Sequence, residues 1–98
     1  MQSSTTKVLV INPNITEAML EGVLLHARRG LPREIELVGV SARRGIAVVA
    51  TRATFVIAAQ SVLETWACYR SAAQCGEAPQ AIVIACFGDP GVAALREL

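Results

Sequence analysis

Two short segments hold the residues that are best suited to catalysis or ligand binding. One is CFGDPG at residues 86–91 and the other is NPN at residues 12–14, and each follows a run of apolar residues. Glycine-rich and Asn-rich turns that open a helix present backbone amides and the positive dipole end to an anion. In such a place the pKa of a thiol falls below its ordinary value of about 8.5. We therefore predict a reactive Cys86 beside an anion-binding cradle.

Other site motifs are excluded by their absence from the sequence. It lacks GxGxxG, GxxxxGK[ST] and GxSxG, which removes dinucleotide, P-loop and α/β-hydrolase sites. A phosphatase-type thiolate needs an arginine a few residues downstream, whereas position 92 is Val92 and the first arginine after Cys86 is Arg96. Three widely spaced cysteines without CxxC, and the single histidine His26, indicate neither a disulfide framework nor a metal site.

The elements that must position these loops alternate between strand and helix. Apolar spacing predicts strands at residues 7–11, 34–40 and 81–87, and helices at residues 15–29, 51–74 and from 90 onward. Residues 41–45 are expected to be a loop, and the state of 46–50 is left open. We expect Asn14 or Thr16 to cap the first helix and Asp89 to cap the last. The order predicts a parallel α/β sheet covered by helices on both faces, with ligands at the carboxyl ends of the strands.

The third predicted strand is unusual because it is apolar throughout. From Ala81 to Cys86 every residue is apolar, which is typical of a strand in the middle of a sheet with both faces covered. Only two other strands are predicted, and the sequence stops at Leu98, about two turns into a helix. We therefore interpret residues 1–98 as the N-terminal α/β half of a longer protein, truncated in its last helix. Such an incomplete sheet favours a homo-oligomer in the full-length protein.

Composition removes several classes of protein. The chain is 53% hydrophobic and 17% charged, so it has ample surface to bury and is not disordered. A net charge of +1 leaves no basic surplus for nucleic acid. No apolar run reaches the roughly 20 residues of a membrane span, and the run near the N-terminus, Val8–Ile11, is too short for the core of a signal peptide. We expect a cytoplasmic protein without a membrane or nucleic-acid partner.

Three segments together resemble the Asp/Glu/hydantoin racemase family. They are Ile11–Asn14 followed by Thr16 and Met19, Gly45–Ala59 with Thr51-Arg52-Ala53, and Ala85-Cys86-Phe87-Gly88-Asp89-Pro90-Gly91. The resemblance spans essentially the whole chain, but only the first of the family's two similar α/β halves. It implies a flavodoxin-like fold. The sequence departs from the family at Ile15, where Thr or Ser usually follows NPN.

The resemblance also implies an activity, namely racemisation without a cofactor. Two cysteines on opposite faces of a carbon acid act as base and acid, and Cys86 is one of them by analogy. The second would lie in the other half, so the chain alone is expected to be inactive. The substrate would be a small carboxylate or a hydantoin-like molecule. Substrate contacts are expected from five positions: Asn12, Asn14, Thr51, Gly88 and Asp89.

Other interpretations of the same residues remain open. Related proteins of this kind include decarboxylases and maleate-type isomerases, and the chain could also be a non-catalytic anion-binding remnant. Cys86 could be a small buried hydrophobic residue. Asn14, Thr51 and Asp89 could serve only as helix caps. Cys68 and Cys75 are expected to be structural residues of the long helix.

Overall fold

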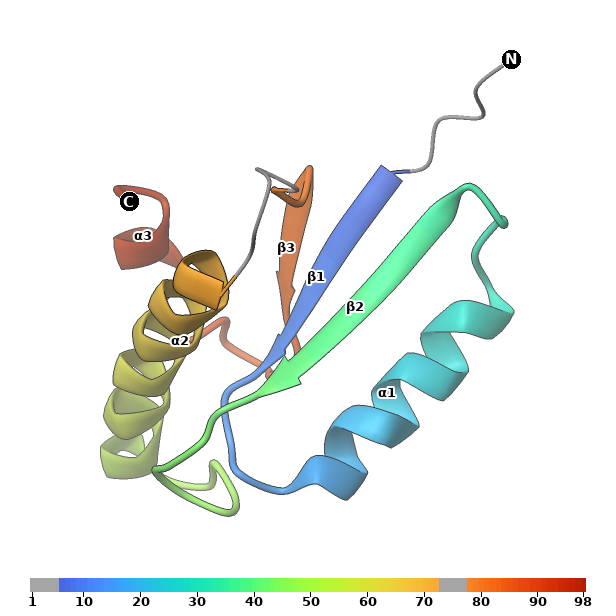
Figure 1. Ribbon diagram of the computed structural model, residues 1–98. Coiled ribbons are helices and arrows are strands. Elements are labelled where there is room, and N and C mark those ends of the chain that lie inside the picture. Colours follow the sequence, from blue (N-terminus) through green and yellow to red (C-terminus); the bar gives the residue numbers. More distant parts are fainter. Residues whose placement is uncertain (1–5, 73–77) are drawn as a thin grey trace.

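The computed structural model describes residues 6–72 and 78–98, which form one parallel sheet with helices on both faces (Figure 1). The elements within these ranges are β1 (Thr6–Asn12), α1 (Glu17–Arg29), β2 (Ile35–Ser41), α2 (Arg52–Ala72), β3 (Ala81–Ile84) and α3 (Val92–Leu95). The predicted α/β class and the alternating order of strands and helices are confirmed.

The strand order is β2-β1-β3, so β1 is central and β3 is an edge of the sheet described here. Parallel pairing runs from Thr6↔Ile35 to Asn12↔Ser41 on one side of β1, and from Val8↔Ala81 to Ile11↔Ile84 on the other. The expected place of the third strand in the middle of a larger sheet stays a prediction, because this chain supplies only three strands. Val83, near the centre of β3, is 48% exposed, because α1 covers the β1–β2 side of that face.

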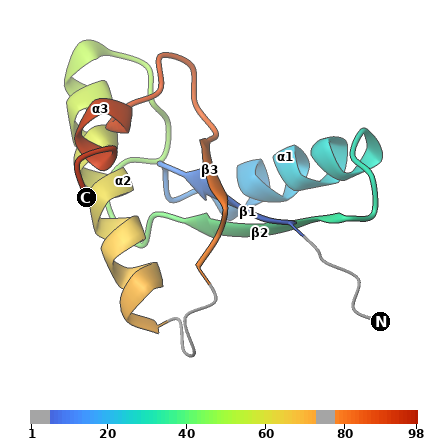
Figure 2. The same cartoon turned by 90° about the horizontal axis from the view of Figure 1, so that it is seen from above.

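Alternation along the strands supplies two separate hydrophobic cores. Leu9, Ile11 and Ile84 pack with Val62 of α2 on one face. Val10 and Leu37 pack with Leu20 of α1 on the other. Because α3 also packs on the first of these cores, α2 and α3 lie on one face of the sheet and α1 on the opposite face (Figure 2). The fold therefore has three layers, α/β/α.

The third strand and the last helix are both shorter than predicted. The strand ends at Ile84 rather than at Phe87, because the Cys86 amide turns back to donate to the Ile84 carbonyl at 2.9 Å. The helix starts at Val92 rather than at Pro90, and its N-cap is Gly91, not Asp89. Asp89 and Gly91 have φ values of +50° and +83°, which a helical first turn does not allow.

The other helix ends lie close to the predicted positions. The first helix begins at Glu17, two residues later than expected, because the Asn14 Oδ1 atom accepts the Thr16 amide at 2.9 Å and holds the turn before it. The second begins at Arg52, and its predicted end at Gln74 lies outside the described residues, as does Cys75.

The segment whose state was left open is a loop that is hydrogen-bonded to the residues before α1. Residues 46–50 belong to neither helix nor strand. The Ile15 amide donates to the Ile46 carbonyl and the Thr16 hydroxyl donates to the Ala47 carbonyl, both at 2.9 Å. This loop is therefore attached to the start of α1. Within residues 6–72 and 78–98, no helix is long and apolar enough to cross a membrane.

Candidate functional site

Cys86 lies at the carboxyl edge of the sheet, next to the end of the central strand. The Ala85 amide donates to the Ile11 carbonyl at 2.9 Å, so residues 12 and 86 leave adjacent strands side by side. After β1 the chain passes to the α1 face, and after β3 it passes to the α2 face (Figure 1). Such a divergence is the switch point at which open parallel sheets bind ligands. The structure thus brings the NPN and CFGDPG loops to one edge, as the sequence predicts.

A tight turn follows the cysteine. The Asp89 amide donates to the Cys86 carbonyl at 3.3 Å, and Gly88 between them has a φ of +82°. A Cβ atom at Gly88 would lie 2.9 Å from Phe55 Cε1 of α2, so the turn is pressed against that helix. Glycine is needed here both for its backbone conformation and for the close approach.

The pKa of the Cys86 thiol is raised, contrary to the prediction. Burial is the main cause, since desolvation disfavours the thiolate, and the nearby Asp89 carboxylate raises the pKa further. The expected helix start does not lower it, because α3 has four residues and begins only at Val92. Cys86 is half-buried and is therefore protonated at neutral pH.

The backbone amides that follow Cys86 differ in whether they are already hydrogen-bonded. Within the described chain the amides of Phe87 and Gly88 donate to no protein acceptor, whereas the Asp89 amide is bonded to Cys86. Both residues are exposed, so these two amides are open to solvent or to a ligand. Sequence reasoning missed Phe87, because a backbone donor leaves no trace in a residue type. Its side chain is 99% exposed.

The buried side chain of Asn12 links the segments at the carboxyl edge of the sheet through hydrogen bonds. Its side chain is 2% exposed, and its Nδ2 atom lies 3.1 Å from Asn14 Oδ1, 3.2 Å from the Thr16 carbonyl and 3.1 Å from Ser41 Oγ. The Asn12 Oδ1 atom accepts the Asn14 amide at 3.4 Å. These bonds join the ends of β1 and β2 to the start of α1. Contact between Asn12 and substrate stays a prediction.

Two other predicted site residues have structural roles as well. Asn14 is 5% exposed, and its Oδ1 atom accepts the Asn12 side chain and the Thr16 amide. Thr51 caps α2: its hydroxyl accepts the Thr54 amide at 3.1 Å, while the Thr51 amide donates to Thr54 Oγ1 at 2.7 Å. This is a reciprocal capping pair, with threonine in the place usually taken by glutamate. Substrate contact by either residue stays a prediction.

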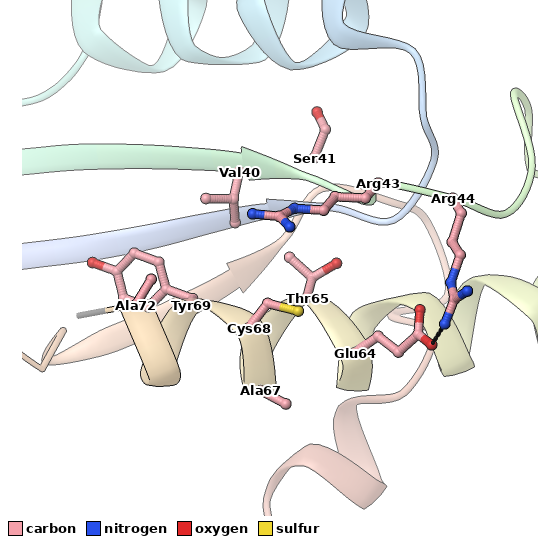
Figure 3. Close-up of a pocket in the computed structure, with 10 residues that line it drawn as sticks. All are labelled: Val40, Ser41, Arg43, Arg44, Glu64, Thr65, Ala67, Cys68, Tyr69 and Ala72. Atoms are coloured by element: carbon pink, nitrogen blue, oxygen red, sulfur yellow. Dashed lines mark hydrogen bonds and ion pairs between the residues drawn. The ribbon is translucent and has the colours of Figure 1, made fainter.

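A cavity of about 650 Å³ lies away from the cysteine, between the end of β2 and α2 (Figure 3). Its lining includes Arg43, Arg44, Glu64 and Cys68, but none of the predicted site residues. The sequence did not indicate it, since the cavity joins segments about 20 residues apart. Residues 6–72 and 78–98 contain no group of three metal-ligating His, Cys, Asp or Glu side chains.

Comparison with known proteins now fixes the family. A model of the Asp/Glu/hydantoin racemase family matches residues 8–98. The chain belongs to the Asp/Glu/hydantoin racemase family. The match includes both loops that meet at Cys86.

Relatives within the racemase family have named activities. The chain is 34% identical over 92 residues to a hydantoin racemase from Paenarthrobacter aurescens and to one from Pseudomonas sp. (strain NS671). The fold superposes on an allantoin racemase from Klebsiella pneumoniae with a TM-score of 0.84 and 35% identity.

The matches cover nearly all of this chain but little of each relative. They span 94% of the chain against 37% and 35% of the two hydantoin racemases. The allantoin racemase structure is matched over 96% of this chain and 36% of its own. The chain thus corresponds to little more than a third of these racemases.

Proposed function

We propose that this chain is the N-terminal part of a cofactor-independent racemase in which Cys86 exchanges a proton with the stereogenic carbon of the substrate. The observation that carries the proposal is the position of Cys86 at the β1/β3 switch point. The family match and the named racemase relatives support it. The remaining part of the racemase would supply the opposing base.

The protonation state of Cys86 suggests its role in the first half of turnover. A second group, a thiolate in the proposed mechanism, removes the proton from the carbon beside the substrate carbonyl. The C–H electron pair moves onto that carbonyl and forms an enolate. Cys86, protonated because burial and Asp89 raise its pKa, then donates its S–H proton to the opposite face. Turnover leaves a Cys86 thiolate and a protonated partner, which is the arrangement needed for the reverse direction.

The enolate needs donors that are in place before the reaction. The unbonded amides of Phe87 and Gly88 adjoin Cys86 in the chain, and we assign them to the enolate oxygen. Preorganised donors of this kind contribute several kcal/mol to such reactions, roughly 2.7–4 kcal/mol for one donor. Asp89 would then affect the reaction through the pKa of Cys86, and the backbone amide of Asp89 would not contact the enolate.

The charge near Cys86 favours an uncharged substrate. Asp89 raises the pKa of Cys86 through its negative charge, so it also disfavours a second carboxylate in the same place. Hydantoins and allantoin are neutral cyclic ureides, and the named relatives act on these compounds. We therefore propose a cyclic ureide in preference to aspartate or glutamate.

Solvent deuterium exchange tests the proposal. In the full-length protein, Cys86→Ala and Cys86→Ser should abolish incorporation of deuterium at the stereogenic carbon of a hydantoin in D₂O. Cys68→Ser is the matched control, since Cys68 is an exposed cysteine on α2 that lies outside the site, and it should exchange at the normal rate. Undiminished exchange in Cys86→Ala would remove Cys86 from the mechanism.

A further inference from the structure

The cavity between β2 and α2 has the size and lining of a small-molecule site. Its volume of about 650 Å³ falls within the roughly 300–1,000 Å³ of ligand pockets. Val40 of β2 and Ala72 and the Tyr69 ring of α2 give it apolar walls. Cys86 does not line the cavity, so the cavity is separate from the proposed racemase site.

Charge in the cavity is unbalanced. Arg44 Nη2 lies 2.9 Å from Glu64 Oε2, and this pair raises the pKa of Arg44 and lowers the pKa of Glu64, so both side chains remain charged and compensate each other. Arg43 makes no ion pair or hydrogen bond with any other described residue. Figure 3 shows its side chain running back over the cavity, between Val40 and the side chains of α2. The lining therefore carries one uncompensated positive charge.

The unused polar groups in the cavity are donors. The Tyr69 hydroxyl has no hydrogen-bond partner among the described residues and lies at the end of the cavity away from the Arg44–Glu64 pair (Figure 3). The Thr65 hydroxyl already donates to the Ser61 carbonyl at 2.7 Å. The Ser41 hydroxyl points away from the cavity, where it accepts from Asn12. A ligand rich in acceptors would satisfy the groups that remain.

We propose that this cavity binds a small monocarboxylate with an apolar body, whose carboxylate pairs with Arg43. One uncompensated charge matches one carboxylate, and the apolar walls match an aliphatic or aromatic body. A phosphate dianion would call for a second cation, and Arg44 is already paired with Glu64. Cys68 lines the same cavity as an exposed thiol, so its modification reports on occupancy.

Benzoate and its uncharged analogue benzamide are suitable probes of the 98-residue chain. Titration calorimetry should give saturable benzoate binding that is about fivefold tighter than benzamide binding, the effect of one exposed charge pair. Saturating benzoate should also slow alkylation of Cys68, as measured by peptide mapping. Arg43→Gln should remove the preference for benzoate while leaving benzamide binding unchanged.

Arg96→Gln is the matched control, because Arg96 is an exposed arginine that does not line the cavity. It should retain the preference for benzoate. The proposal is overturned if benzoate does not saturate, or if Arg43→Gln and Arg96→Gln bind it equally. It is also overturned if Cys68 is protected by rising protein concentration and not by benzoate, which would make the cavity an interface between two copies. Since Arg43 has no partner among the described residues, its substitution should leave the fold intact.

Discussion

At the scale of single residues, the reactivity of Cys86 is governed by its surroundings and not by a helix dipole. Burial disfavours the thiolate, and the carboxylate of Asp89 adds to this effect. A thiol with a raised pKa is a better proton donor at neutral pH than a nucleophile. In the proposed mechanism, Cys86 would therefore deliver a proton before it accepts one.

Asp89→Asn should lower the pKa of Cys86. Removal of the negative charge eliminates one of the two causes of the raised pKa. The pH at which alkylation of Cys86 is half-maximal should therefore fall. It should still lie above that of a free thiol, because burial, the larger cause, remains. Asparagine tolerates the φ of +50° at this position, so the fold should persist. Alkylation rates at Cys86 measured from pH 7 to 11 by peptide mapping test this; an unchanged midpoint would contradict the contribution of Asp89.

Gly91→Ala should lower the free energy of unfolding by about 2 kcal/mol. The φ at this residue is +83°, and a Cβ atom would lie 3.1 Å from the Ala59 carbonyl oxygen of α2. Gly22→Ala on α1 is the matched control, since a Cβ atom there meets nothing within 4 Å. It should raise stability by up to about 1 kcal/mol. Urea denaturation measures both, and equal effects of the two substitutions would refute the packing argument.

At the scale of elements, the loops at the carboxyl edge are fixed by contacts between distant segments. The 46–50 loop is attached to the start of α1, while Gly88 and Gly91 press the loop after β3 against α2. The loop after β3 therefore depends on a well-formed first turn of α2, because Phe55 in that turn packs against Gly88.

Thr51→Ala should destabilise α2 by about 1 kcal/mol, because the Thr54 amide loses its acceptor. Thr51→Ser retains the hydroxyl and should keep most of the stability. Unfolding free energy and hydrogen exchange of the Thr54 amide measure the loss. If Thr51→Ala and Thr51→Ser are equally stable, the hydroxyl is not the cap.

Elements that depend on local sequence patterns could be predicted, whereas features that depend on contacts between segments could not. The β-branched run of β1 and the apolar stripe of α2 are local patterns, so these elements were found within a few residues. The late start of α3 follows from the positive φ values of Asp89 and Gly91, which the expected capping role of Asp89 did not anticipate. The raised pKa of Cys86 and the pairing of Arg44 with Glu64 also come from burial and from contacts between segments.

At the scale of the whole molecule, the two faces of β3 differ. Ile84 is 8% exposed and packs against α2, whereas Val83 faces the α1 side and is 48% exposed. Since β3 is also the last strand of the order β2-β1-β3, its outer backbone groups are open to further pairing. We therefore propose that the rest of the racemase, or another copy in a homo-oligomer, covers it.

Two neighbouring substitutions separate these faces. Ile84→Ala should cost about 2–4 kcal/mol of unfolding free energy in this chain, whereas Val83→Ala should change it by less than about 0.5 kcal/mol. In the full-length protein Val83→Ala should become clearly destabilising if the Val83 side of β3 is covered there. Equal costs in the 98-residue chain and in the full-length protein would show that Val83 stays uncovered.

The placement of Asn12 also has a consequence for chemical ageing. Spontaneous deamidation of asparagine proceeds when the next residue's backbone nitrogen, carrying its hydrogen, attacks the side-chain carbonyl. Here that residue is Pro13, which has no N–H, so the ring closure is blocked. The protection matters, because an aspartate at position 12 would turn a carboxylate toward the oxygens of Asn14, Thr16 and Ser41.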